Sequence, residues 1–182
     1  KNKNINLDKS RTIGISKSNI NFFNNNISKI DKILWSIKKI KIFSENSGHD
    51  KLIEFKEPSS HLFSIINNFK LYRQLNSELN KIKYYKAKND ISFEKLGNFG
   101  YDLIINCDPN HLITKKFFSK KFEKKYDSFA FTTIIEHKKL AFNNIAIQIF
   151  TKKGPMAFLP ISNNKTSVVY SMRIKNVEQN LD

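Results

Sequence analysis

The sequence predicts a mixed α/β (α+β) protein, and three observations support this class. The first two thirds of the chain show helical periodicity and one short run of continuous apolar residues, whereas the last third contains long segments with strand patterns. The chain has 182 residues, of which 40% are hydrophobic and 16 are phenylalanine, so it can bury a core. Because the two patterns alternate along the chain, we expect two interleaved domains.

The first third of the chain is expected to contain a helix and a hairpin. Residues 11–27 begin with a short apolar alternation and continue into a helix, for which Ser16 or Ser18 is available as the N-cap. Residues 31–46 have the pattern of a helix end followed by a strand, in which Ile40 and Ile42 alternate with lysines. A turn at residues 44–50 and a second strand, which Pro58 stops, complete the predicted hairpin.

The middle of the chain is expected to contain a helix and a buried strand. A helical stripe opens after Asn67 and Asn68, and residues 81–88 and 91–96 are short and strand-like. Residues 101–108 are different, because three consecutive apolar residues precede Asp108. That pattern predicts a strand buried on both faces of a parallel sheet. The helical stripe that opens after Asn67 and Asn68 consists of Phe69, Tyr72, Leu75 and Leu79.

The last third of the chain is expected to form a sheet. Strand patterns cover residues 129–137, 146–152, 156–161 and 166–174. The connections between them are short, at residues 139–144, 152–155 and 162–165. Short connections join neighbouring antiparallel strands, so the pattern predicts an antiparallel meander.

The formal net charge of +16 raises the question of a nucleic-acid partner. Nearly all of the basic residues are lysine, with arginine only at positions 11, 73 and 173, and they are spread along the chain. This distribution favours solvated lysine faces over a dedicated nucleic-acid interface. The same charge would attract an anionic membrane surface. No apolar run reaches the length of a bilayer span, and the first residues lack the apolar core of a signal peptide, so we expect a cytoplasmic protein.

Metal chemistry and hydrolase chemistry have little support in the sequence. The single cysteine, Cys107, excludes an internal disulfide and a cysteine-rich metal site, and we expect a small buried side chain among apolar neighbours. The four histidines do not pair with other ligands at metal-binding spacing, so no metal site is expected. No nucleophile elbow or phosphate-binding glycine loop is evident. The histidines are His49, His61, His111 and His137.

Residues 126–171 carry a more specific signal: a Gly-Pro pair, an apolar strand with Leu-Pro, a polar turn and a Ser-x-Val sequence. This run resembles the flavin-dependent aromatic hydroxylases of ubiquinone biosynthesis, the 2-polyprenyl-6-methoxyphenol hydroxylase family, which has a p-hydroxybenzoate hydroxylase-like fold. The matching positions are Tyr126, Phe150, Gly154, Pro155, Leu159, Pro160, Ser167, Val168, Val169 and Ser171, and Tyr170 stands where the family usually has tryptophan.

Three upstream segments resemble the same family in the same order. Asp8 and Arg11 are similar to an Asp-x-Arg motif with one extra residue, Asn68 matches a position that faces the cofactor, and Asp108 matches the aspartate of an Asp-Gly turn. The resemblance implies a cofactor site that contains Arg11, Asn68 and Asp108, and a substrate pocket that contains Phe150, Gly154 and Pro155. It assigns no catalytic residue.

The resemblance also implies the fold and the reaction. Residues 1–28 and 60–122 would form part of an FAD-binding Rossmann-like domain, and residues 29–59 and 123–182 would form an antiparallel β-sheet substrate domain. The implied activity is hydroxylation of a polyprenylated phenol with FAD as cofactor and NAD(P)H as reductant. The implied partners are the polyprenyl phenol, other ubiquinone-biosynthesis proteins and, peripherally, the inner membrane.

The departures from the family pattern leave two functional hypotheses open. The chain begins with Lys1 rather than methionine, so we expect a piece of a longer chain or a processed product; the family's glycine-rich fingerprint would lie before Lys1 and a second cofactor motif after Asp182. Pro109 occupies the glycine position of the middle motif, where its ring fixes φ near about −65° and removes an N–H donor. We therefore expect the chain alone to bind FAD poorly. It is either a fragment of a working hydroxylase or a non-catalytic relic or assembly subunit of the same family, with a nucleic-acid-binding protein as a distant third.

Overall fold

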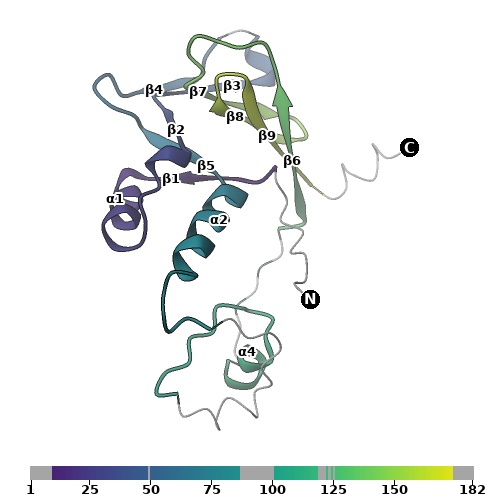
Figure 1. Ribbon diagram of the computed structural model, residues 1–182. Helices are drawn as coiled ribbons and strands as arrows, with labels where there is room; N and C mark the ends of the chain where they lie inside the picture. The colour runs from purple at the N-terminus through teal and green to yellow at the C-terminus, as the bar shows by residue number, and fades with distance from the viewer. Residues whose placement is uncertain are drawn as a thin grey trace. The chain divides into compact units, whose positions relative to one another are not determined.

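The structure is a computed structural model that describes residues 10–48, 50–86, 101–118, 122, 124 and 126–173 (Figure 1). The chain divides into two compact units. The first unit consists of Lys1–Ile82 and Asp127–Asp182, and the second consists of Lys83–Tyr126. In the described part of the chain, none of the helices combines the length and the apolar character needed to cross a membrane.

A three-stranded antiparallel sheet forms one layer of the first unit. Strand β5 (Phe63–Asn67) lies in its centre, between β1 (Thr12–Ile15) and β2 (Leu34–Ile37). Helix α1 (Lys17–Asn26) follows β1, and the Ser16 hydroxyl accepts a hydrogen bond from the Asn19 amide at 3.3 Å. Ser16 is therefore the N-cap, which selects one of the two serines that the sequence offered. A short 3₁₀ helix, η1 (Asp31–Ile33), leads into β2.

Helix α2 (Asn68–Leu79) begins directly after β5. Its N-cap is Asn67, whose side chain accepts a hydrogen bond from the Lys70 amide at 3.2 Å, so the predicted start of the helix is confirmed. The strand before the helix was not predicted. The apolar residues Ile65 and Ile66 are adjacent and do not alternate with polar residues, because their side chains enter different cores on the two faces of the sheet.

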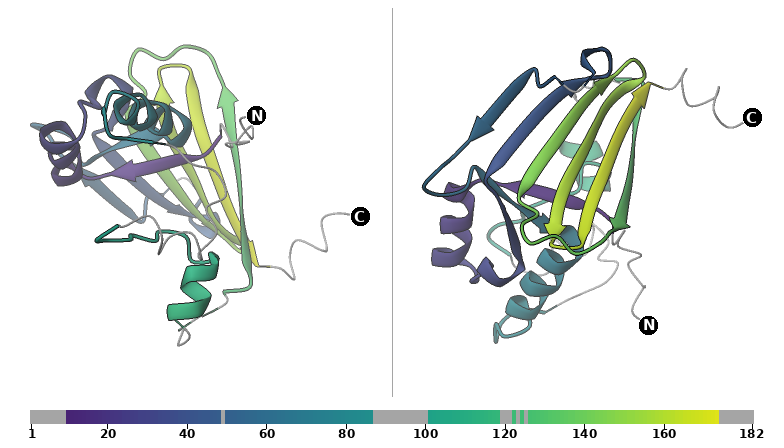
Figure 2. Two further views of the ribbon diagram at one scale, coloured as in Figure 1. Left: turned by 60° about the horizontal axis from the view of Figure 1, so that its bottom comes forward. Right: turned by 90° about the horizontal axis from the view of Figure 1, so that it is seen from above.

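A six-stranded sheet forms the other layer of the first unit (Figure 2). The predicted hairpin is confirmed as β3 (Lys39–Ser44) and β4 (Ile53–Lys56), with η2 (Glu45–Ser47) after β3. The predicted meander is confirmed for β7 (Ile145–Thr151), β8 (Gly154–Ser162) and β9 (Lys165–Arg173).

The order of the six strands corrects the predicted meander at β6 (Ser128–Glu136). The sheet has the order β4-β3-β7-β8-β9-β6, so β6 pairs with β9 at the edge and not with β7, the next strand along the chain. The place beside β7 is taken by β3, which runs parallel to it. A hairpin from the first third of the chain thus excludes β6 from the position that a simple meander would give it.

The two sheets pack face to face at one end of the larger sheet (Figure 2). Ile37 and Ile65 from the small sheet and Ala146 from the large sheet are buried together. The polar contacts that join the layers include a hydrogen bond from Thr12 Oγ1 to Ser167 Oγ at 3.1 Å and one from the Trp35 indole to the Asn143 carbonyl at 2.6 Å. A second core, on the other face of the small sheet, contains Ile15, Ile20, Ile30 and Ile66.

The second unit contains one described helix, α4 (Leu112–Phe117), whose N-cap is His111. The predicted buried strand at residues 101–108 is wrong, because these residues form no strand and the side chains of Leu103 and Ile105 are 74% and 77% exposed. A buried strand needs hydrogen-bonded neighbours on both edges, and no described strand pairs with this segment. For the same reason, the predicted burial of Cys107 is wrong, and its side chain is exposed. Residues 81–86 also form no strand, and residues 91–96 lie outside the described residues.

The two predicted domains follow the sheets only in part. The small sheet and α2 come from residues assigned to the cofactor domain, except that β2 falls in the substrate segment 29–59. All six strands of the large sheet come from the two substrate segments. The boundaries at residues 28, 59 and 122 stay a prediction. The compact units of the structure are divided at different positions.

Candidate functional site

Arg11 and Asn68, two of the predicted cofactor residues, are neighbours in the structure. The Asn68 amide donates a hydrogen bond to the Arg11 carbonyl at 3.0 Å, because the antiparallel register places Thr12 opposite Asn67. Arg11 precedes β1 and is exposed, and Asn68 is the first residue of α2 and is half-buried. The fold thus places the backbones of these two residues side by side where β1 meets α2.

Asp108, the third predicted cofactor residue, lies in the second unit. Its carboxylate accepts a hydrogen bond from the Asn110 amide at 2.9 Å, and its carbonyl accepts one from Thr114 Oγ1 at 2.7 Å. The His111 amide also donates to the Asp108 carbonyl, at 3.2 Å. The turn that contains Asp108 and Pro109 is therefore held by its own hydrogen bonds.

The three predicted substrate residues come together at the hairpin between β7 and β8. Phe150 lies opposite Pro155 in the register, and both are exposed. Thr151 Oγ1 donates to the Gly154 carbonyl at 2.6 Å and accepts from the Gly154 amide at 3.2 Å. Gly154 has φ of +145°, and a Cβ atom there would lie 1.9 Å from the Ser171 carbonyl oxygen. Only glycine permits this close approach of β9.

Strand β1, which follows Arg11, and the hairpin between β7 and β8 contact the large sheet at different positions. Thr12 of β1 reaches β9 at Ser167, whereas Gly154 contacts β9 at Ser171. Four residues of a strand span about 13 Å. The contact of β1 with Ser167 and the contact of the Phe150–Pro155 hairpin with Ser171 therefore lie at different positions along β9.

Between these contacts the large sheet presents residues that sequence reasoning did not select. The register places Gln148, Ala157 and Val169 side by side, with Ser171 and Ala130 paired in the next row. They lie on the face whose other end packs against the small sheet, because residues two apart on a strand share a face. We call these five residues the open strip, since each is at least partly exposed. Strand alternation in the sequence was the available signal, but the register between strands was needed to assemble them.

Ionisable groups with shifted pKa values lie in surface ion pairs of the described part of the chain. A hydrogen bond from Lys51 lowers the pKa of Glu54, one from Lys81 lowers the pKa of Glu78, and one from Lys165 lowers the pKa of Glu136. A carboxylate with a lowered pKa stays ionised and is a poor general acid near neutral pH. The open strip therefore offers shape and apolar surface, and its polar groups are the Gln148 amide and the Ser171 hydroxyl.

The predicted FAD contacts fit the structure only in part. Arg11 is exposed and its backbone is hydrogen-bonded to that of Asn68, and a guanidinium suits a phosphate or a ribityl hydroxyl. The Asp108 turn does not fit a pyrophosphate, because its amides at positions 108, 110 and 111 already donate within the turn. Within the described residues, no group of three or more histidine, cysteine or acidic side chains could hold a metal ion.

No protein-family model matches the chain, and the comparison with curated proteins found no match either.

Proposed function

We propose that the chain is part of an FAD-dependent monooxygenase that hydroxylates a polyprenylated phenol. The observation that carries the proposal is the open strip together with the Phe150–Pro155 hairpin, an apolar surface on one face of a sheet. A prenylated ring that lies on this surface would remove apolar area from water, at about 25 cal/mol per Å². In the same proposal, β1, α1 and α2 belong to the Rossmann-like cofactor domain.

Each group has a task in this proposal. Arg11 and Asn68 would hold FAD, which supplies the activation of oxygen with electrons from NAD(P)H. Phe150 and Pro155 would exclude water from the ring. The Gln148 amide and the Ser171 hydroxyl would orient the phenol by hydrogen bonds, so that a ring C–H bond is replaced by a C–O bond and the second oxygen atom leaves as water.

A non-catalytic member of the same family is the second candidate, and the Asp108 turn favours it. That turn satisfies its own amides, and Pro109 adds no donor. Such a protein would keep the sheet surface as a contact for other ubiquinone-biosynthesis proteins and would not bind FAD.

An FAD titration monitored by flavin fluorescence separates the two candidates. We would titrate this chain and the longest product that the reading frame allows, each with Arg11→Gln and with Arg173→Gln as a control that removes the same charge from an exposed end of β9. The hydroxylase proposal predicts that the longer product binds FAD and that Arg11→Gln weakens binding about tenfold, because a charge-assisted hydrogen bond contributes about 1.5–3 kcal/mol. Absence of binding by both proteins would leave the non-catalytic candidate.

A further inference from the structure

A cavity lies beside the start of α2, and Asn67 and Phe69, which flank Asn68, contribute to its lining. It has a volume of about 510 Å³ and lies between the start of α2, strand β6 and the turn from β8 to β9. None of Arg11, Asn68, Phe150, Gly154 and Pro155 lines it. Its volume is within the range of small-molecule sites, about 300–1,000 Å³.

The floor of the cavity is apolar. Ile65 comes from the small sheet, and Ile134 and Ile161 come from the large sheet. Ile65 is 1% exposed, so the floor is continuous with the core between the two sheets. A ligand on this floor gains by presenting an apolar ring.

The rim of the cavity is cationic. Among the described residues that line it, Lys70, Arg73 and Lys165 are charged and none is acidic. Lys165 has a partner, since its Nζ lies 2.6 Å from the Glu136 carboxylate. Lys70 and Arg73 form no ion pair with a described residue, and the Arg73 guanidinium lies 5.8 Å from the centre of the Phe69 ring.

The spacing of Lys70 and Arg73 along α2 also favours binding of an anion. Residues three apart on a helix are neighbours, and like charges at that spacing repel each other. An adjoining hollow of about 430 Å³ shares Ile33, Lys70 and Arg73 with the cavity, so both cations border open space on α2. An anion between the two side chains would convert the repulsion into two charge-assisted hydrogen bonds.

We propose that this cavity binds a small organic anion in which a phosphate, sulfonate or carboxylate is joined to an aromatic ring. The ring lies on Ile65, Ile134 and Ile161, and the anionic group lies between Lys70 and Arg73. The proposal uses neither FAD nor the open strip, and its test measures binding of a small anion without FAD, so the result does not depend on the proposed hydroxylase activity.

Calorimetric titrations of the full chain at constant ionic strength test the site with three probes: phenyl phosphate, inorganic phosphate and phenol. The expected result is that phenyl phosphate binds at least about tenfold more tightly than either of the other two, because only it uses both the floor and the rim. Equal affinity for phenyl phosphate and inorganic phosphate would overturn the proposal and indicate non-specific attraction by a chain of charge +16.

Matched variants locate the binding. Lys70→Gln with Arg73→Gln should weaken phenyl phosphate about tenfold or more, whereas Lys17→Gln with Lys29→Gln, which removes the same charge from exposed positions outside the cavity, should leave its affinity within about twofold. Arg73→Lys should retain part of the affinity. Circular dichroism checks that each variant is folded, and an equal loss of affinity in both double variants would also overturn the proposal.

Discussion

At the scale of single residues, Gly154 shows why a turn motif is conformationally demanding. Its φ of +145° lies in a region that side chains with a Cβ atom rarely adopt, and the Ser171 carbonyl occupies the place of that atom. The Gly-Pro sequence indicated a turn, but the reason for glycine is a strand that is 17 residues away in the sequence, at Ser171. Backbone strain and close approach therefore coincide at one position.

Gly154→Ala is expected to lower the free energy of unfolding by at least about 3 kcal/mol, because strained backbone and a clash with β9 add together. The matched control is Gly14→Ala, where the nearest atoms to a new Cβ are Phe63 ring carbons at 3.5 Å, an ordinary contact. We expect the control to change stability by less than about 1 kcal/mol. Urea denaturation measures both, and equal effects would contradict this account.

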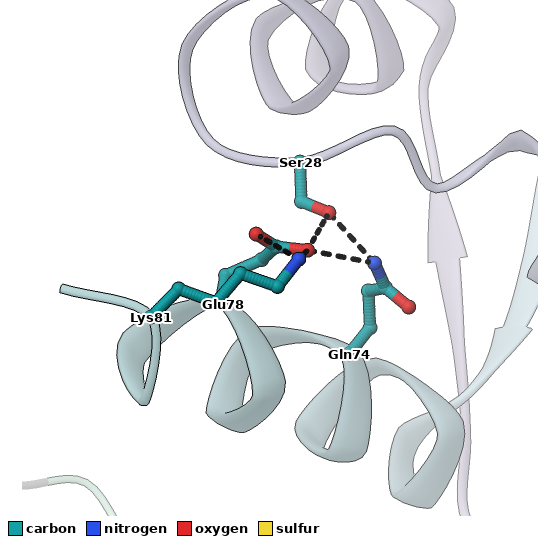
Figure 3. Close-up of polar contacts among 4 residues, drawn as sticks. All are labelled: Ser28, Gln74, Glu78 and Lys81. Carbon is teal, nitrogen blue, oxygen red and sulfur yellow. Dashed lines mark hydrogen bonds and ion pairs between the residues drawn. The ribbon is translucent and has the colours of Figure 1, made fainter.

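At the scale of elements, α2 is tied to the loop after α1 by a small polar cluster (Figure 3). The Glu78 carboxylate accepts from the Ser28 hydroxyl at 3.2 Å and from Lys81 Nζ at 2.9 Å, and the Gln74 amide donates to Ser28 Oγ at 2.8 Å. Ser28 directly follows the C-terminal end of α1, so the Glu78 carboxylate links α2 to a segment 50 residues earlier in the sequence. The hydrogen bond from Lys81 lowers the pKa of Glu78.

The lowered pKa of Glu78 predicts a pH dependence with a definite sign. A carboxylate with a lower pKa in the folded state contributes stability that is complete above its unfolded pKa, near 4.5, and is lost as the pH falls through the folded pKa. Lys81→Gln should raise the pKa of Glu78 and reduce the loss of stability at low pH. Lys17→Gln should leave the pKa of Glu78 unchanged. Carboxyl NMR titration measures the pKa, and an unchanged value in Lys81→Gln would refute the role of the ion pair.

At the scale of the first unit, the two sheets share one core, and Ile37 is fully buried within it. Trp35, the single tryptophan of the chain, donates its indole N–H to the loop that connects β6 and β7. Its fluorescence therefore reports on the contact between the layers, while circular dichroism reports on strands and helices throughout the chain.

Ile37→Ala is expected to cost about 2–5 kcal/mol of unfolding free energy, since it leaves a cavity between the sheets. Leu52→Ala, at a side chain that is 54% exposed, should cost less than about 1 kcal/mol. In the unsubstituted chain, tryptophan fluorescence and the β-sheet signal should change at the same urea concentration if the layers unfold together. Separate transitions would show that the sheets are stable independently.

Local sequence patterns were sufficient to predict N-caps and short turns, because these features depend on residues that are close in the sequence. Ser16 and Asn67 are N-caps that bond to amides three residues later, and the short turns of residues 152–155 and 162–165 fix the neighbours of β8. Phe150, Gly154 and Pro155, which the family resemblance assigned to a substrate pocket, come together in one hairpin because they lie within six residues of one another.

The remaining features depend on segments that are distant in the sequence. Three features require contacts between distant segments, which no local pattern encodes. They are the pairing of β3 with β7, the position of β6 at the sheet edge and the hydrogen bond between Asn68 and Arg11. Residues 101–108 show the limit most clearly, because an apolar run predicts burial only if neighbouring strands exist to cover it. By itself, the sequence determined caps, turns and the mixed class of the protein. The tertiary structure alone decided the strand order, the open strip and the cationic cavity, because each is assembled from side chains that only long-range packing brings together.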